Sequence, residues 1–305
     1  MQTRVEFDQL SESYAQNRFP ADATVQDMRD AFARGAVLPP TGVVSARRQL
    51  GGRPAIELRP EGAGDGILLY LHGGGYVLGS AETGVGMAAG LAVRTDTTAY
   101  SLEYRLGPEN RFPAAVDDAL AAYADLVERH GADRLLIAGD SAGGGLAVAT
   151  LIAAREAGLE MPVAAAVFSP HTDLTLSGAS FRGRDGDDPL FRPADIAASV
   201  RRYLPEDDTV RAARSPLASP VFADLSGLPP LLIQVGSREL LHDDALRLAV
   251  NAAHADVDVT LESAARAPHN YQTAVGRLAA ADRALDRAAV FLAERLGERA
   301  VMQEA

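Results

Sequence analysis

The sequence predicts an α/β fold in which helices cover a mostly parallel, doubly wound sheet of eight strands. From about residue 43 onward, short β-type runs alternate with longer Ala- and Leu-rich helical stretches, as is typical of a parallel sheet. Several strand candidates, such as GILLYL and LLIQVG, are continuous apolar runs that fit strands buried on both faces. With 305 residues and 47% hydrophobic content, the chain can bury a large core.

The strand candidates begin after a polar, helical N-terminal stretch, residues 1–40. Its clearest amphipathic piece is Val25–Gly35, which Gly35 and the pair Pro39-Pro40 end. The eight strands are expected at Val43–Leu50, Ala55–Arg59, Ile67–His72, Thr98–Glu103, Arg134–Ala138, Val163–Ser169, Leu231–Val235 and Val257–Ser263.

The alternation of strands and helices breaks in residues 171–215, a polar stretch rich in Asp and Arg with one helix candidate, Pro193–Leu204. Ligands of open α/β sheets bind beyond the carboxyl ends of the strands. We therefore expect this insertion, together with residues 1–40, to cover that end. The helices that alternate with the strands are expected at Gly84–Val93, Ala114–His130, Ser141–Glu156, Asp244–Ala253 and Thr273–Leu296.

Composition excludes several classes of function. The formal net charge of −12 argues against a nucleic-acid partner, because binding there depends on Lys and Arg that neutralise phosphates. The absence of cysteine excludes disulfides, thiolate nucleophiles and Cys-ligated metals. No apolar run reaches the ~18 residues of a membrane span, and the N-terminus lacks the apolar region of a signal peptide. A cytoplasmic location without membrane contact is expected.

The segment Gly139-Asp140-Ser141-Ala142-Gly143 carries the first chemical signal. It has the form G-x-S-x-G and lies between a predicted strand and a predicted helix, which is the context that a nucleophile elbow requires. Small residues two before and two after the serine let the neighbouring backbones pass. The alternative is a Gly-rich turn whose serine only caps a helix.

A second signal is His72-Gly73-Gly74-Gly75, which also follows a predicted strand. Acyl transfer requires preorganised N–H donors for a negative oxygen, and glycine lets backbone approach a substrate closely. We expect the N–H groups of Gly74, Gly75 and Ala142 to form this oxyanion hole, with His72 and Gly73 shaping the loop. A phosphate-binding loop would need a different continuation from Tyr76-Val77-Leu78.

A serine nucleophile needs a base and an acid, and in this fold the chain order is serine, acid, histidine. His269 follows the last predicted strand, so it is preferred as the base over the other histidines after Ser141. The acid should follow the next-to-last strand, where Glu239, Asp243 and Asp244 are all available. The three other histidines are His171, His242 and His254.

These motifs resemble those of the hormone-sensitive lipase family of α/β-hydrolases, bacterial carboxylesterases with an HGGG loop and a GDSAGG elbow. LYLHGGGYVLGS and GDSAGGGLA are similar to the family's two signatures. YRLGPENRFPAAVDDA resembles its YRLAPEHPFPAAVEDA stretch, and SPHTDLTLSGASF resembles a segment of its acetyl- and lactone-hydrolases. The resemblance implies the α/β-hydrolase fold, with a small helical cap from residues 1–40 and 171–215 on a catalytic core of residues 41–170 and 216–305.

The resemblance also implies site residues. The family's triad acid falls on Glu239, and its second, structural acid falls on Asp243; Asp243 as the triad acid is the alternative. Where the family often has H-G-F, this chain has His269-Asn270-Tyr271, which keeps the base and an aromatic residue but loses the glycine. A homodimer contact near the C-terminal helix is expected by resemblance only.

The sequence thus predicts a serine carboxylesterase that acts on a small-molecule, short-chain ester without a metal or an organic cofactor. A lactone hydrolase and an N- or O-deacetylase of a secondary metabolite are alternatives within hydrolysis. A non-catalytic receptor on the same fold is a more remote alternative, because such receptors lose the histidine that is present here. The acidic run Asp185-Gly186-Asp187-Asp188 lacks the rest of a calcium loop, so a solvated turn is expected there.

Overall fold

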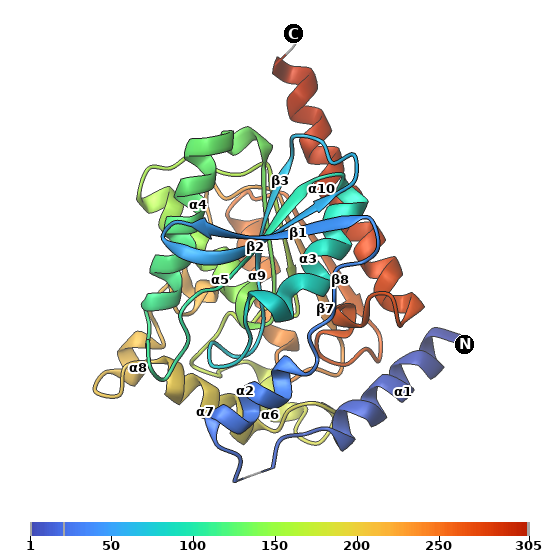
Figure 1. Ribbon diagram of the computed structural model, residues 1–305. Helices are drawn as coiled ribbons and strands as arrows, with labels where there is room; N and C mark the ends of the chain where they lie inside the picture. Colours follow the sequence, from blue (N-terminus) through green and yellow to red (C-terminus); the bar gives the residue numbers. More distant parts are fainter. Residues whose placement is uncertain (1, 21, 304–305) are drawn as a thin grey trace.

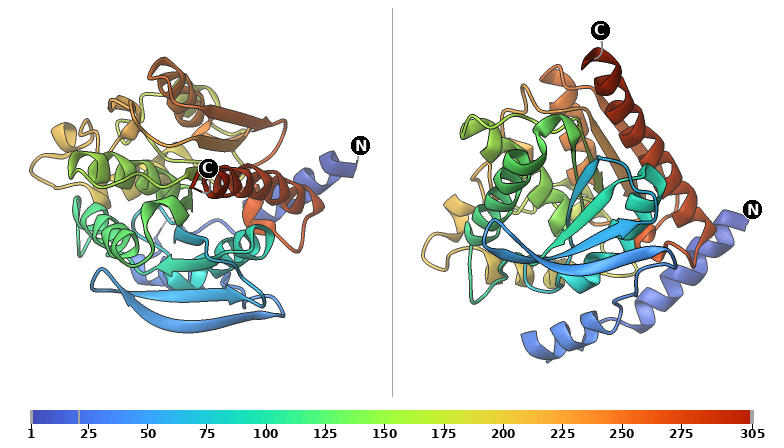
Figure 2. Two further views of the ribbon diagram at one scale, coloured as in Figure 1. Left: turned by 90° about the horizontal axis from the view of Figure 1, so that it is seen from above. Right: turned by 45° about the horizontal axis from the view of Figure 1, so that its top comes forward.

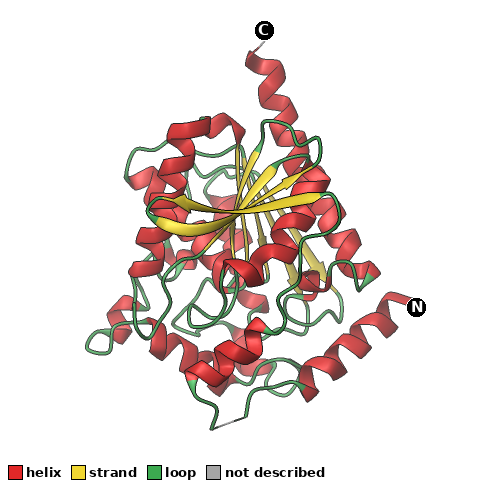
Figure 3. Ribbon diagram, in the orientation of Figure 1, coloured by secondary structure: helices red, strands yellow, loops and turns green. Residues whose placement is uncertain are grey.

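The computed structural model of the protein describes residues 2–20 and 22–303. Eight strands form one sheet in the order β1-β2-β4-β3-β5-β6-β7-β8, drawn in yellow in Figure 3. The predicted strands are all present, with ends that differ from the expected ones by at most two residues. Their bounds are β1 Val43–Leu50, β2 Arg53–Pro60, β3 Ile67–Leu71, β4 Thr98–Leu102, β5 Leu135–Asp140, β6 Ala164–Phe168, β7 Leu231–Gly236 and β8 Val259–Ala264.

The sheet is parallel except at one edge. β1 and β2 form a hairpin, and β2 also pairs antiparallel with β4. Gly51 and Gly52 make the hairpin turn with φ values of 56° and 78°, a left-handed pair that glycine adopts without strain. The remaining neighbours pair in parallel, so their carboxyl ends meet at one edge of the sheet.

Helices cover both faces of the sheet (Figure 1). One face packs against α3 and α10, and the other packs against α4, α5 and α9. Because the central strands β3, β5, β6 and β7 are covered on both sides, they are buried along their whole length, as their apolar runs predict. The helices are α3 Ala81–Thr95, α4 Ala114–His130, α5 Ala142–Glu156, α9 His242–His254 and α10 Ala279–Gln303.

The N-terminal segment and the insertion, residues 2–20, 22–40 and 171–215, gather below the sheet in Figure 1. We refer to them as the cap; the division into cap and core stays a prediction. The cap helix α1 lies beside the start of α10 (Figure 2). The prediction of a single helix in the insertion is wrong, because the insertion contains three helices, α6, α7 and α8. The cap helices are α1 Gln2–Gln16, α2 Val25–Ala33, α6 Ala179–Gly183, α7 Pro193–Tyr203 and α8 Thr209–Ala212.

Two predicted helix starts are also wrong. α3 begins three residues before the expected Gly84, because the side chain of Ser80 caps its first turn. α10 begins six residues after the expected Thr273, since a 3-10 turn, Tyr271–Ala274, and Gly276 with φ 75° come before it. Within the described residues, no helix is both long and apolar enough to cross a membrane.

Candidate active site

Ser141 lies in a sharp turn between β5 and α5. Its φ and ψ of 53° and −120° are a strained conformation for a residue with a side chain. A Cβ at Gly139 would overlap the carbonyl oxygen of Gly143, and one at Gly143 would overlap that of Leu71. The two glycines of the motif are therefore required for the turn to close.

Three of the predicted site residues form one hydrogen-bonded chain. Nε2 of His269 lies 2.9 Å from Oγ of Ser141, and Nδ1 lies 2.7 Å from Oε2 of Glu239. The residues follow β5, β7 and β8, whose carboxyl ends the parallel sheet brings together. His269 is 1% exposed and Glu239 is fully buried. The arrangement can take a proton from the serine and stabilise the resulting imidazolium.

Glu239 is held by more than the imidazole. Its Oε1 accepts hydrogen bonds from the hydroxyl of Ser169, at 2.6 Å, and from the backbone N–H of Gly236. Ser169 is buried directly after β6, and its hydroxyl oxygen also accepts a 3.1 Å hydrogen bond from the backbone N–H of Asn270. Sequence reasoning missed Ser169, because in the sequence it is only the last residue of an apolar run.

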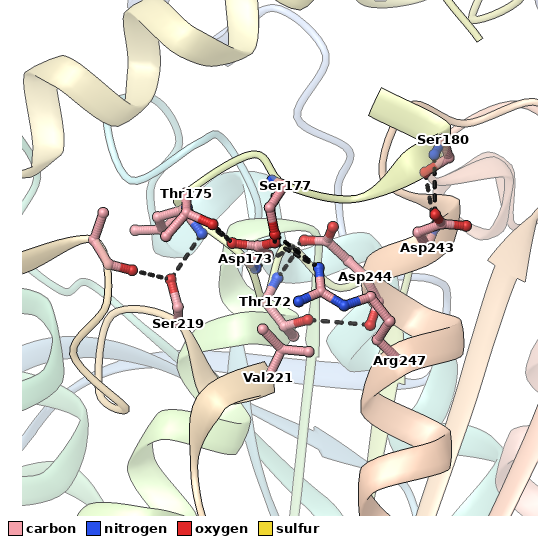
Figure 4. Close-up of polar contacts among 12 residues, drawn as sticks. Thr172, Asp173, Thr175, Ser177, Ser180, Ser219, Val221, Asp243, Asp244 and Arg247 are labelled. Atoms are coloured by element: carbon pink, nitrogen blue, oxygen red, sulfur yellow. Dashed lines mark hydrogen bonds and ion pairs between the residues drawn. The ribbon is translucent and has the colours of Figure 1, made fainter. Parts of the chain in front are cut away.

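The other two acids considered for this role point elsewhere (Figure 4). Oδ2 of Asp243 accepts a 3.0 Å hydrogen bond from the N–H of Ser180, in the first turn of α6. Asp244 is buried, and its Oδ2 accepts from the N–H groups of Thr172 and Asp173 at 2.8 and 2.9 Å. Both side chains fix the start of the insertion, and Glu239 is the acid that contacts His269.

The loop after β3 carries the predicted N–H donors. Gly73 donates its N–H to Oδ1 of Asp140 at 3.0 Å. Among the hydrogen bonds of the described residues, none has the N–H of Gly74, Gly75 or Ala142 as its donor, so these three groups can still donate. Gly74 and Gly75 have φ values of 121° and 63°, which side chains disfavour.

The side chain of His72 supports the start of this loop. Its ring is stacked on Tyr104 with centroids 4.2 Å apart, and its Nδ1 lies 2.8 Å from the carbonyl oxygen of Gly73. Burial lowers the pKa of His72 to about 4, so the ring is neutral near pH 7 and Nδ1–H donates to that carbonyl. The hydroxyl of Tyr104 donates to the carbonyl of His72 at 2.6 Å, which fixes the entry to the loop.

The missing glycine after the histidine has a structural substitute. Asn270 lies in the left-handed region, with φ 52° and ψ 36°, where asparagine is tolerated better than most side chains. Its side-chain amide donates a 2.7 Å hydrogen bond to Oδ2 of Asp140. Oδ1 of Asp140 accepts from Gly73 and from the hydroxyl of Tyr70. Asp140 therefore joins the elbow, the glycine loop and the histidine loop.

The remaining histidines have other positions. His171 is buried at the start of the insertion, and its backbone N–H donates to the carbonyl of Ser141 at 2.9 Å. Nε2 of His242 lies 3.0 Å from the hydroxyl of Ser263, and His254 is the last residue of α9.

At His269, burial alone would lower the pKa, but the charge and the hydrogen bond of Glu239 raise it above its ordinary value.

Comparison with known proteins agrees with this geometry. A family model described as alpha/beta hydrolase fold matches residues 68–273. An acetyl-hydrolase of Streptomyces hygroscopicus is 42% identical over 271 residues, 88% of each chain. An esterase of Acinetobacter venetianus is 35% identical over 69% of each chain.

Solved structures of esterases are also similar to this chain. The crystal structure of an esterase from the bacterial hormone-sensitive lipase family superposes with a TM-score of 0.90 at 36% identity, covering 96% of this chain and 98% of that one. The crystal structure of EstE5 soaked with p-nitrophenyl butyrate also has a TM-score of 0.90, at 35% identity, covering 96% and 99%.

The fold and the elbow define an α/β-hydrolase. Within that class, the chain belongs to the hormone-sensitive lipase family of esterases, and it is a carboxylic ester hydrolase. The non-catalytic receptor considered from the sequence is therefore set aside.

Proposed function

We propose that the protein is a serine carboxylesterase that hydrolyses short-chain acyl esters through Ser141, His269 and Glu239. The observation that supports this most directly is the unbroken chain of contacts from Oγ of Ser141 through both ring nitrogens of His269 to Glu239. In this proposal Ser141 attacks the acyl carbonyl while His269 accepts its proton. His269 then gives the proton to the leaving alcohol, and water releases the acyl group by the same steps.

The proposed oxyanion hole consists of the N–H groups of Gly74, Gly75 and Ala142. They lie at the glycine loop and at the N-terminus of α5, where backbone N–H groups favour negative charge. Each such donor contributes about 3 kcal/mol of transition-state stabilisation in serine hydrolases. The proposed chemistry uses no metal or organic cofactor, because proton transfer and backbone donors supply each step.

Ser141→Ala provides the direct test. We expect it to lower kcat for p-nitrophenyl acetate or butyrate by about four to six orders of magnitude, because the nucleophile is removed. Paraoxon should modify the wild-type protein once, at Ser141. Turnover that survives in Ser141→Ala would contradict the proposed mechanism.

A deacetylase acting on an N- or O-acetyl group is the second candidate, favoured by the similarity to the Streptomyces acetyl-hydrolase. Rates measured over linear esters from acetate to decanoate, lactones and acetamides distinguish it from the short-chain esterase. A rate that falls steeply beyond hexanoate supports the proposed function.

The cytoplasmic location and a homodimer contact stay predictions. Size-exclusion chromatography with light scattering tests the homodimer.

A further inference from the structure

A loop of the cap holds the turn that carries Glu239. This turn, residues 237–240, follows β7, and the cap loop is residues 184–191. Nε of Arg238 donates to the carbonyl of Asp187 at 3.1 Å, and the N–H of Leu240 donates to Oδ2 of Asp188 at 2.9 Å. The side chain of Arg184 also donates to the carbonyl of Ser237. The cap loop thus contacts the turn on both sides of Glu239.

Asp188 is the centre of these contacts. Its side chain is buried, with the residue 1% exposed. Oδ1 accepts hydrogen bonds from the N–H groups of Leu190 and Phe191 at 2.8 and 3.0 Å, in addition to the bond from Leu240 to Oδ2. A buried carboxylate is stable only when such donors replace water. The solvated turn predicted for this acidic run is therefore wrong for Asp188, although Asp185 and Asp187 are exposed.

The same carboxylate fixes a wall of the site. The backbone of Phe191, which Asp188 holds, places the Phe191 ring 5.1 Å from the His269 ring between centroids, tilted by 59°. From the N-terminal part of the cap, Arg18 donates to the carbonyls of Asp188 and Pro189 at 2.6 and 3.0 Å. Both parts of the cap and the acid turn therefore meet at Asp188.

We propose that Asp188 is a positioning residue for ester hydrolysis, which couples the docking of the cap to the orientation of Glu239 and His269. It acts on Glu239 through the backbone of Leu240 and on His269 through the ring of Phe191. This inference rests on the proposed function of Ser141, His269 and Glu239. Its physical basis is that small displacements of a base or its acid partner lower the rate strongly.

The charge of Asp188 gives a separate readout. The carboxylates that raise the pKa of His269 against the effect of burial are Glu239 first, then Asp188 and Asp140. Burial, with a smaller contribution from the charge of His269, lowers the pKa of His171, on the loop after β6, to about 4, so this histidine is neutral near pH 7. Replacing Asp188 by a neutral residue should therefore lower the pKa of His269. The acidic limb of the kcat/KM profile should move to lower pH, because activity requires the neutral imidazole.

Asp188→Asn is the test, and Asp187→Asn is its matched control because it removes one exposed carboxylate from the adjacent residue. An asparagine can accept from Leu240 or from the Leu190–Phe191 pair, but its NH₂ must face the other N–H group. For p-nitrophenyl butyrate we expect Asp188→Asn to lower kcat about 10- to 100-fold with a smaller change in KM, and to shift the acidic limb. Asp187→Asn should match the wild type in both.

Arg18→Met covers the case in which Asp188→Asn does not fold. It leaves Asp188 in place and removes the two hydrogen bonds that tie the N-terminal segment to the cap loop, so kcat should fall in the same direction. The inference is overturned if Ser141→Ala is inactive while Asp188→Asn, or Arg18→Met where the first is unfolded, keeps wild-type kcat and loses only thermal stability. If Ser141→Ala is as active as the wild type, the proposed function fails and the inference fails with it.

Discussion

The side-chain amide of Asn270 donates a 2.7 Å hydrogen bond to Asp140, the residue before Ser141. Asp140 also accepts from Gly73 in the glycine loop. One carboxylate thus fixes the loop of the proposed base relative to the loop of the proposed oxyanion donors. This link explains how the site keeps its geometry without the glycine that the family often has after the histidine.

Asn270→Gly should therefore lower activity without a large loss of stability. Glycine keeps the left-handed conformation of residue 270 but removes the hydrogen bond to Asp140, so we expect kcat to fall about tenfold. Asn270→Asp should be worse, because it brings a second carboxylate against Asp140. Steady-state kinetics and thermal unfolding of both variants check this. Wild-type kcat in Asn270→Gly would show that the link is dispensable.

Glu239→Gln should damage catalysis far more than Asp243→Asn. Glutamine cannot compensate the imidazolium charge on His269 and can favour the wrong tautomer, so we expect kcat to fall about 10³-fold or more. Asp243 accepts from Ser180 at the start of α6, and an asparagine oxygen can accept the same bond. Measurement of kcat for both variants under the same conditions tests this prediction. A larger loss of kcat in Asp243→Asn than in Glu239→Gln would identify Asp243 as the acid of the triad.

Gly75→Ala should affect turnover more than folding. A Cβ there would lie 3.1 Å from the Ser199 side chain of α7, and the left-handed strain costs roughly 1–2 kcal/mol. Because the strain displaces a proposed oxyanion donor, kcat should fall about 10- to 100-fold. Gly74→Ala should lower both activity and stability, since its Cβ would overlap the backbone of Leu78. Equal losses of stability in the two variants would contradict this distinction.

Asp244 should make stability depend on pH. Burial, with the nearby charge of Asp173, raises the pKa of Asp244 from 3.8 to about 8. Between these values the folded protein keeps a proton that the unfolded chain releases. The stabilising contribution is complete below about pH 4 and is lost as the pH rises to about 8.

Asp244→Asn removes the carboxyl group that titrates, so this variant does not lose stability through residue 244 as the pH rises. Its side-chain oxygen can still accept from the N–H groups of Thr172 and Asp173. Its free energy of unfolding relative to the wild type should rise between pH 4 and 8, by at most about 1.4 kcal/mol per pH unit. Urea unfolding at pH 5, 7 and 9 measures the difference. Parallel stability curves for the two proteins would show that Asp244 keeps an ordinary pKa.

The sequence alone was sufficient for the fold class because its strongest signals are local. A buried parallel strand needs a continuous apolar run, and Ile67–Leu71 and Leu231–Gly236 are such runs. An elbow needs small residues at fixed distances from its serine, and Gly139 and Gly143 supply them. The chain order of the strands was then enough to predict that Ser141, His269 and an acid after the next-to-last strand would meet at one edge of the sheet. The choice of Glu239 over Asp243 and Asp244 came from the family resemblance.

Only the tertiary structure decided which groups hold those residues in place. Ser169 meets Glu239 across 70 positions of sequence, and Asp140 meets Asn270 across 130. Asp188 lies in a stretch that looks solvated, yet it is buried because the acid turn supplies an N–H donor 52 positions away. A local pattern records which backbone conformation a residue favours, whereas the burial and hydrogen bonds of a polar side chain depend on what strand order and cap docking bring against it.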